Sequence, residues 1–594
     1  MKIFLAVIAG MTAACPGLAA EPEKPLPRTN VVVILSDDQG WGDLSVNGNR
    51  NVATPHIDSL ARDGVAFDRF FVSPLCSPTR AEFLTGRYHS RVGVRGVSTG
   101  LERLDLDQKT IADTFRSAGY VTGAFGKWHN GSQWPYHPNA RGFDEFYGFT
   151  SGHWGEYFDP PLEHNGQFIR GKGFIADDLT GRALSFIEKN RVRPFFCYLA
   201  FNTPHSPFCV PDSYWDRFKD NPIALRGRDG DKEDLPVTRC ALAMCENLDW
   251  NVGRVLQKLD ALRLAQNTIV VFLSDNGPNS SRWNGGMKGR KGSTDEGGVR
   301  VPMMIRWPGN LKPGTTVREI AGAIDLLPTL AGLTNVPLIS TSPLDGRDLA
   351  PLLLGKARDW PDRIIFTHQG GKVSVRTQQY RLDDRGALFD MTTDPNQQTD
   401  IATQNPEAAA KLKQAVADWR KEVLAVAKDE RPYPVGYPEF PITSLPARDG
   451  VPHGNIRRSA GAPNCSYFTN WISPEDSMTW DIAIHTAGDY EATIHYTCPL
   501  ADAGSTIELS FQESKLRGEV APGWDPPLIT DQDRVPRKGE SYQKEFRPLK
   551  LGVIHLEQGR GTLTLRAQRS AGKQVADVRL VTLTLLKDNA KPIR

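Results

Sequence analysis

Four short aliphatic runs, each followed at once by polar side chains, constrain the fold of this 594-residue chain more than any other feature. They do not alternate with polar residues, which is typical of strands buried on both faces of a parallel sheet. Helical patterns separate them, for example over residues 112–118 and 242–262. The four runs cover residues 31–35, 120–125, 195–201 and 269–273. They predict an α/β domain with a doubly wound, mostly parallel sheet.

Chemically useful residues follow each of these runs. In open α/β sheets, ligands bind beyond the carboxyl ends of the strands. We therefore expect one rim of the sheet to gather the side chains of Asp37, Asp38, Lys127, His129, His205, Asp275 and Asn276. The carboxylates and the amide among them form an all-oxygen set, which favours Ca²⁺ or Mg²⁺ over zinc. For either acidic pair alone, the alternative is a turn that caps a helix.

A further candidate group stands at the start of a predicted helix, in the sequence Cys76-Ser77-Pro78-Thr79-Arg80. Pro78 suits the first helical turn, whose unpaired N–H groups and partial positive charge favour an anion. Cys76 is thus placed where a nucleophile would meet an anionic substrate. A buried structural thiol is the alternative for a lone cysteine. A thiolate phosphatase would need five residues between cysteine and arginine in a glycine-rich loop, whereas this segment has three and lacks the glycines.

The spacing Cys-x-Pro-x-Arg resembles the motif of the type I sulfatases, within the alkaline phosphatase superfamily. The resemblance extends over about residues 28–430, including segments 344–353 and 388–395 outside the site. It implies that a separate maturation enzyme oxidises Cys76 to formylglycine (3-oxoalanine), whose hydrate attacks sulfur. It also implies a Ca²⁺ ion at Asp37, Asp38, Cys76, Asp275 and Asn276.

The resemblance implies a role for the basic side chains as well. Arg80 and Lys127 hold the formylglycine oxygens, and His129 takes a proton from the hydrate. His205 contacts the sulfate and can protonate the leaving oxygen, a task that suits an imidazole. His153 is a further residue on the sulfate side.

A glycine-rich segment near Gly285 holds the last basic candidate. Lys291 matches the family's sulfate-binding lysine, although Lys288 and Arg290 are close enough to leave the choice open. A flexible basic surface loop is the alternative interpretation. Substrate specificity is expected on loops 134–157 and 207–234, where five aromatic residues could stack on a sugar: Tyr136, Trp154, Tyr157, Tyr214 and Trp215.

The pattern changes along the rest of the chain. Residues 28–360 are predicted to form the α/β catalytic domain, and 361–430 a subdomain with a small antiparallel sheet and a helix over 406–427. A Pro-rich linker is predicted at 431–446. Alternating apolar and polar runs then predict a β-sandwich over 447–594, which resembles accessory domains of some bacterial sulfatases.

The N-terminus predicts export. Residues 1–20 resemble a signal peptide with Lys2 and a short apolar run, and a lipid anchor at Cys15 is the alternative. No later run is long enough to span a membrane. In an oxidising compartment some of the eight cysteines could pair, Cys465 with Cys498 for instance. The net charge of +2 gives no reason to expect a nucleic-acid partner.

The sequence therefore predicts an exported, Ca²⁺-dependent sulfatase that hydrolyses sulfate monoesters of a sulfated carbohydrate. One alternative is a phosphatase or phosphonate monoester hydrolase of the same superfamily. Another, of a different class, is a carbohydrate-binding protein whose catalytic domain is inactive.

Overall fold

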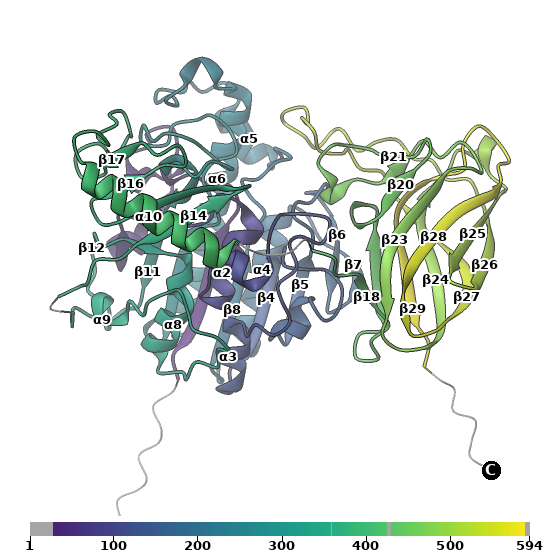
Figure 1. Cartoon of the computed structure of the whole chain (residues 1–594), viewed down its shortest axis with the longest axis horizontal. Coiled ribbons are helices and arrows are strands. Elements are labelled where there is room, and N and C mark those ends of the chain that lie inside the picture. Colours follow the sequence, from purple (N-terminus) through teal and green to yellow (C-terminus); the bar gives the residue numbers. More distant parts are fainter. Residues whose placement is uncertain (1–27, 358, 425–428, 588–594) are drawn as a thin grey trace, which may run out of the picture.

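The computed structural model describes residues 28–357, 359–424 and 429–587. Within them the chain forms an α/β domain and a β-sandwich, which lie side by side in Figure 1. The predicted signal peptide and Cys15 lie outside the described residues, as does the end of the helix predicted to reach residue 427. In the described part of the chain, no helix combines the length and the apolarity needed to cross a bilayer.

A ten-stranded sheet organises the α/β domain. Its order is β12 (Thr315–Val317), β2 (Val65–Phe67), β11 (Met303–Arg306), β9 (Thr268–Ser274), β1 (Asn30–Ser36), β8 (Phe195–Ala200), β4 (Val121–Lys127), β5 (Glu145–Phe149), β6 (Pro161–His164) and β7 (Gln167–Arg170). The five strands from β9 to β5 run parallel, whereas β11, β6 and β7 pair antiparallel at the two sides. The four aliphatic runs form β1, β4, β8 and β9, which confirms the predicted doubly wound, mostly parallel sheet.

Helices cover both faces of this sheet because successive strand residues point to opposite sides. Val32 and Ile34 of β1 pack with helices α1, α4 and α6, whereas Val31, Val33 and Leu35 pack with α2, α3 and α8. The helices that precede the small antiparallel sheet of this domain are α1 (Pro55–Arg62), α2 (Cys76–Thr85), α3 (Ile111–Ser117), α4 (Ile175–Lys189), α5 (Asp212–Phe218), α6 (Leu235–Ala261), α7 (Glu296–Val299), α8 (Leu326–Thr334) and α9 (Ala350–Leu353).

Two smaller sheets complete the α/β domain. One joins β10 (Arg300–Val301), β3 (Phe70–Phe71) and β13 (Ala321–Gly322). The other is antiparallel and joins β14 (Ile365–Gln369), β15 (Lys372–Arg376), β16 (Tyr380–Leu382) and β17 (Leu388–Asp390). Helix α10 (Pro406–Val423) covers the latter through Leu412 and Trp419, as its apolar stripe predicts.

The β-sandwich encloses its own apolar core between two sheets. The first sheet joins β18 (Tyr433–Val435), β23 (Ser477–Ile484), β28 (Gly559–Arg569), β25 (Ser505–Phe511) and β26 (Ser514–Val520), with β20 (Val451–His453) on β23. The second joins β21 (Arg457–Arg458), β22 (Phe468–Thr469), β29 (Asp577–Leu585), β24 (Gly488–Thr497) and β27 (Arg547–Leu556), with β19 (Ile442–Pro446) on β29.

Two expectations about this region are wrong. Residues 431–446 are not a linker, because β18 pairs with β23 and β19 pairs with β29 inside the sandwich. Their prolines are tolerated since both segments are short strands at sheet edges. Cys465 and Cys498 do not pair either, and both are buried thiols.

Candidate active site

The carboxyl ends of the central strands meet at one edge, as the register requires. Ser36 of β1 pairs with Ser274 of β9, so Asp37 and Asp275 emerge side by side. The ladder continues past the strands: the Asp37 N–H donates to Thr203 O, and the Asp275 N–H donates to Ser36 O, each at 3.1 Å. Backbone hydrogen bonds therefore fix the backbone positions of Asp37 and Asp275.

Two residues at this edge have a left-handed backbone. Asp38 has φ 63° and His129 has φ 66°, a region that non-glycine residues enter at a cost of roughly 1–2 kcal/mol. The Asp38 N–H donates to Asp275 Oδ1 at 3.1 Å, which ties the first of these turns to the neighbouring strand. Strain of this kind is held where a side chain must be aimed at a site.

Helix α2 brings Cys76 to the same edge. Cys76 is the first residue of the helix, all ten residues of which are buried. Its Sγ and ligand atoms of Asp37, Asp38 and His205 all lie within 4.8 Å of one another. Residues from three parts of the chain thus converge at the amino end of a buried helix.

Three ion pairs join the acidic and basic candidates. Lys127 Nζ lies 2.6 Å from Asp37 Oδ2, Arg80 Nη2 lies 2.8 Å from Asp275 Oδ2, and Lys291 Nζ lies 2.7 Å from Asp38 Oδ1. Only the Lys291 side chain retains exposure, at 20%. Three positive and three negative charges balance in the core, as buried charges must.

The pKa values show how the charges are distributed. Burial alone would raise the pKa of Asp37, but Lys127 and His205 outweigh it and lower that pKa. For Asp38, burial is likewise outweighed, by His205 and Lys291, and its pKa is lowered. Burial and the Asp37 charge raise the pKa of Asp275 despite Arg80. Asp275 can therefore accommodate more positive charge than Arg80 supplies.

The unmodified Cys76 thiol is a poor nucleophile. Burial raises its pKa to about 12, against the opposing effect of Lys127 and Lys291. The thiol therefore stays protonated at neutral pH, whereas the thiolate is the reactive form. This chemistry disfavours the thiolate-phosphatase alternative.

His129 is held in one tautomer. Its Nε2 lies 2.8 Å from Val97 O, and because a carbonyl only accepts, Nε2 must carry the hydrogen. Nδ1 is then the basic nitrogen, and it is buried without a hydrogen-bond partner among the described residues. Burial and Lys127 hold the pKa of His129 well below its ordinary value, so the ring is neutral and its Nδ1 lone pair is free.

His205 and His153 line the other side of the site. Nδ1 of His205 lies 2.5 Å from Ser206 O, and Nε2 lies 3.5 Å from Asp38 Oδ2, so both nitrogens face oxygen atoms. The His153 ring stacks on it, with centroids 5.8 Å apart. The structure thus brings His153 to the site as well.

The oxygen atoms at this edge fit a hard cation. Asp37 Oδ1 and Asn276 Oδ1 are buried and have no hydrogen-bond partner within the described ranges. Asn276 turns its Nδ2 toward Asp38 Oδ1 at 2.7 Å, which leaves its carbonyl oxygen as a donor for a metal. Oxygen donors from three carboxylates and an amide suit Ca²⁺.

The geometry distinguishes Lys291 from its neighbour Lys288. Lys288 Nζ instead lies 3.7 Å from Asp295 and 3.9 Å from Asp383.

We expect Lys291→Gln to lower kcat/KM about 10²- to 10³-fold, the usual effect of losing one group that stabilises transition-state charge. Lys288→Gln is the matched control and should behave as wild type in the same assay. Equal losses for both variants would contradict this assignment.

Sequence reasoning missed residues that the β-sandwich contributes. Glu540 Oε1 accepts a hydrogen bond from Ser206 Oγ at 2.6 Å and lies 3.9 Å from His205 Nδ1. Cys465 Sγ donates to His153 O at 2.8 Å. No motif marks these residues, because their position depends on how two domains pack.

The five aromatic candidates separate into two groups. Tyr136 and Tyr157 are buried, and the Tyr157 hydroxyl donates to backbone oxygens of Asn202 and His205, so their expected role in stacking on a sugar is wrong. Trp154, Tyr214 and Trp215 are only partly buried. The difference between the two groups is therefore one of burial.

Glu82 of α2 gives a stability test of this helix. Burial raises its pKa to about 8, with a small opposing effect of the His89 N–H. Between about pH 4.5 and 8, the folded state therefore keeps a proton on Glu82 that the unfolded state has already lost. The free energy of unfolding falls as the pH rises through this window. We expect Glu82→Gln to flatten the Tm–pH curve and to add on the order of a few kcal/mol at pH 8. Thermal scans from pH 5 to 8, with exposed Glu557→Gln as control, check this; parallel curves for all proteins would refute it.

Comparison with known proteins identifies the family. The Sulfatase family profile matches residues 29–336, more than half of the chain. The chain belongs to the sulfatase family. A second profile, N-sulphoglucosamine sulphohydrolase, C-terminal, matches residues 291–422, so both profiles end before β18. The enzyme is thus a sulfuric ester hydrolase of the alkaline phosphatase superfamily.

Named relatives agree with this assignment. Arylsulfatase A of Homo sapiens is 33% identical over 440 residues, covering 66% of this chain and 80% of the relative. Steryl-sulfatase of Mus musculus is 32% identical over 464 residues, covering 61% and 71%. A solved structure of Ps i-CgsB in complex with k-i-k-neocarrahexaose is 30% identical with a TM-score of 0.60, covering 67% of this chain and 93% of that one. The phosphonate monoester hydrolase of Agrobacterium radiobacter shares the fold alone, at 22% identity and a TM-score of 0.52, covering 66% and 96%.

Proposed function

We propose that this enzyme hydrolyses sulfate monoesters of a sulfated carbohydrate through formylglycine formed from Cys76, with Ca²⁺ as cofactor. The observation that carries the proposal is the convergence of Cys76 with Asp37, Asp38 and His205 within 4.8 Å. Asp275 and Asn276 complete the proposed Ca²⁺ ligands. The proposal includes a maturation enzyme as partner, because formylglycine has to be formed from Cys76 by oxidation.

The chain's own residues have distinct tasks in this proposal. Bound Ca²⁺ would polarise the sulfate oxygens, and the formylglycine hydrate would supply the attacking hydroxyl. Lys127 and Lys291 place positive charge beside residue 76, where negative charge grows in the transition state. Arg80 orients Asp275 through two N–H groups, at 3.2 and 2.8 Å.

Proton transfer falls to the two histidines that flank the site. His129 offers a neutral ring with a free basic Nδ1, which fits the acceptance of a proton from the hydrate. His205 presents both nitrogens to oxygen atoms, which fits donation to the leaving oxygen. His153 packs against His205 and would border the sulfate.

A cleft beside His205 and Lys291 offers room for the leaving group. It measures about 300 Å³, and its lining includes Ser206, Arg290, Lys538 and Glu540. Ser206 and Arg290 are the chain neighbours of the two proposed catalytic residues, so the cleft adjoins the site. Its basic side chains outnumber its two carboxylates, Asp234 and Glu540, which suits a sulfated sugar. The neocarrahexaose complex of a structural neighbour supports this substrate class.

A substrate screen tests the proposal. The enzyme, coexpressed with a formylglycine-generating enzyme, should release sulfate from 4-nitrophenyl sulfate and from sulfated galactan or glycosaminoglycan oligosaccharides. 4-Nitrophenyl phosphate should be a poor substrate. Turnover of the phosphate ester at an equal or higher rate would favour the phosphatase alternative, and oligosaccharide binding without turnover of any ester would favour the inactive binding protein.

The remaining proposals concern organisation. We propose export, based on the signal-like residues 1–20. We also propose that the catalytic unit comprises residues 28–430, with the subdomain of β14–β17 and α10 as its last part. The accessory sandwich would then begin at β18.

A further inference from the structure

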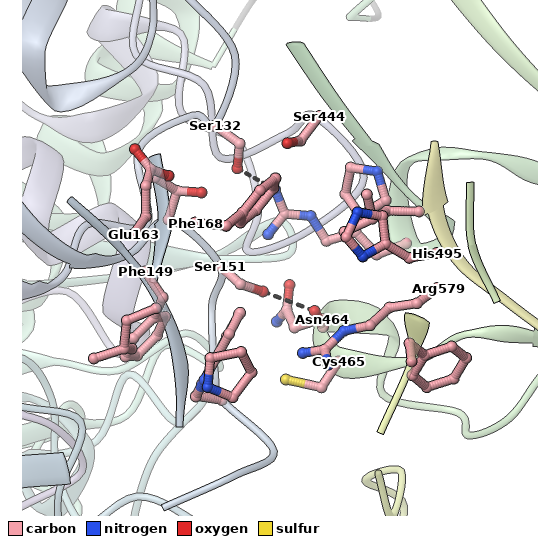
Figure 2. A pocket seen from close by; sticks show the side chains of 18 of the residues that line it. Ser132, Phe149, Ser151, Glu163, Phe168, Ser444, Asn464, Cys465, His495 and Arg579 are labelled. Atoms are coloured by element: carbon pink, nitrogen blue, oxygen red, sulfur yellow. Dashed lines mark hydrogen bonds between the residues drawn. The ribbon is translucent and has the colours of Figure 1, made fainter. Parts of the chain in front are cut away.

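A cavity of about 270 Å³ lies between the α/β domain and the β-sandwich, and the proposed chemistry does not use it. Figure 2 shows side chains of both domains around the same space, with Phe149, Ser151 and Phe168 on one side and His495 and Arg579 on the other. Ligand sites are concave clefts that occur preferentially at interfaces between domains. A space of this size between two well-packed domains is therefore a candidate binding site.

Aromatic rings form much of the cavity wall. Phe149 stacks on Trp154 with centroids 5.0 Å apart, and Phe440 and Phe546 line the wall from the sandwich. Phe168 of β7 is 50% exposed despite its size. An exposed ring at the edge of an aromatic cavity presents an apolar face to a ligand.

Polar side chains belong to the same wall. Ser132, Glu163 and Ser444 line the cavity beside the aromatic rings and are only partly buried. The Arg448 side chain also lines it, and its guanidinium group binds Asp449 and Ser132. A ligand that combines an apolar face with hydroxyl groups would match such a wall.

One loop separates this cavity from the active site. His153 faces His205, whereas its neighbours Ser151 and Trp154 line the cavity. Ser151 Oγ donates to Asn464 O at 2.8 Å, which fastens this loop to the sandwich. A ligand in the cavity would therefore lie on the opposite side of the His153 loop from the reacting sulfate.

We propose that the interdomain cavity binds a sugar unit of a glycan. Aromatic faces match the C–H face of a pyranose, and the side chains of Ser132, Glu163 and Ser444 match its hydroxyl groups. A sterol would leave these polar side chains without hydrogen-bond partners. The inference rests on the proposed carbohydrate substrate, and the sugar is either a distal unit of the substrate chain or a separate saccharide.

Binding and kinetics together test this site. Full-length protein with unmodified Cys76 is titrated calorimetrically with sulfated galactan and glycosaminoglycan hexasaccharides, so that the result does not depend on turnover. Phe168→Ala and the cavity-filling Ser444→Trp should each weaken binding of the better hexasaccharide about tenfold, equivalent to ~1.4 kcal/mol. Trp250→Ala removes a 44% exposed ring that does not line the cavity and should bind as wild type.

The KM values of the matured enzyme and its variants distinguish the two sources of the sugar. A higher KM for the hexasaccharide in the variants, with unchanged KM for 4-nitrophenyl sulfate, identifies a distal unit of the substrate. Weaker binding with unchanged KM for both identifies a separate saccharide. Wild-type affinity in both cavity variants, a failure of both hexasaccharides to bind wild type, or equal loss on both substrates would overturn the proposal.

Discussion

Replacement of Cys76 by alanine is expected to lower kcat on 4-nitrophenyl sulfate by at least ~10⁴-fold, as removal of a nucleophile does in other hydrolases. Cys76 lies at the buried start of α2, and its Sγ lies within 4.8 Å of ligand atoms of Asp37 and Asp38. No other side chain in this described cluster can be converted to an aldehyde. Initial rates of matured wild-type and variant protein provide the measurement.

The control for this variant is another buried thiol. Cys240 lies in α6, packed in the core on one face of the sheet, and Cys240→Ala should retain activity. Circular dichroism and Tm should show that Cys76→Ala still folds, because a small buried side chain is truncated by one atom. Wild-type turnover by folded Cys76→Ala would refute the mechanism.

The second large effect concerns the metal. Asp38→Asn removes a carboxylate that contacts Lys291 and Asn276, and should lower kcat by about 10³-fold or more, since metal and oxyanion stabilisation are lost together. Removal of Ca²⁺ from wild type by a chelator should have a similar effect. A ligand at a concentration 100 times its Kd stabilises the folded state by about 2.7 kcal/mol, so added Ca²⁺ should raise the wild-type Tm.

Thermal scans separate metal binding from catalysis. Ca²⁺ should raise the Tm of wild type and of Asp63→Asn, whose carboxylate is exposed and paired with Arg62. It should leave the Tm of Asp38→Asn unchanged. Full activity in chelator, or an equal Ca²⁺-induced rise in Tm for Asp38→Asn, would remove the metal from the proposal.

Much of the fold followed from residue patterns because those patterns report burial. The aliphatic runs that became β1, β4, β8 and β9 have to be covered on both faces, and only a parallel sheet between helices does so. The rim position of Asp37, Lys127 and Asp275 then follows from strand direction alone. The helical stripe of α10 was equally informative.

Other features depend on contacts between distant segments and left no local signal. Residues 431–446 look like a linker because prolines interrupt them, yet β18 and β19 gain partners from the sandwich 49 or more residues away. Glu540 reaches Ser206 only because the domains pack together. Tyr157 looks like a loop aromatic, although its hydroxyl is satisfied inside the core. The choice between Lys288 and Lys291 likewise required coordinates.

The state of residue 76 tests the central claim most directly. Tryptic peptides from protein coexpressed with a formylglycine-generating enzyme should be analysed by mass spectrometry. The account predicts that the peptide containing position 76 is about 18 Da lighter than its cysteine form, the mass change of thiol-to-aldehyde conversion. An intact thiol in protein that nevertheless hydrolyses sulfate esters would contradict it.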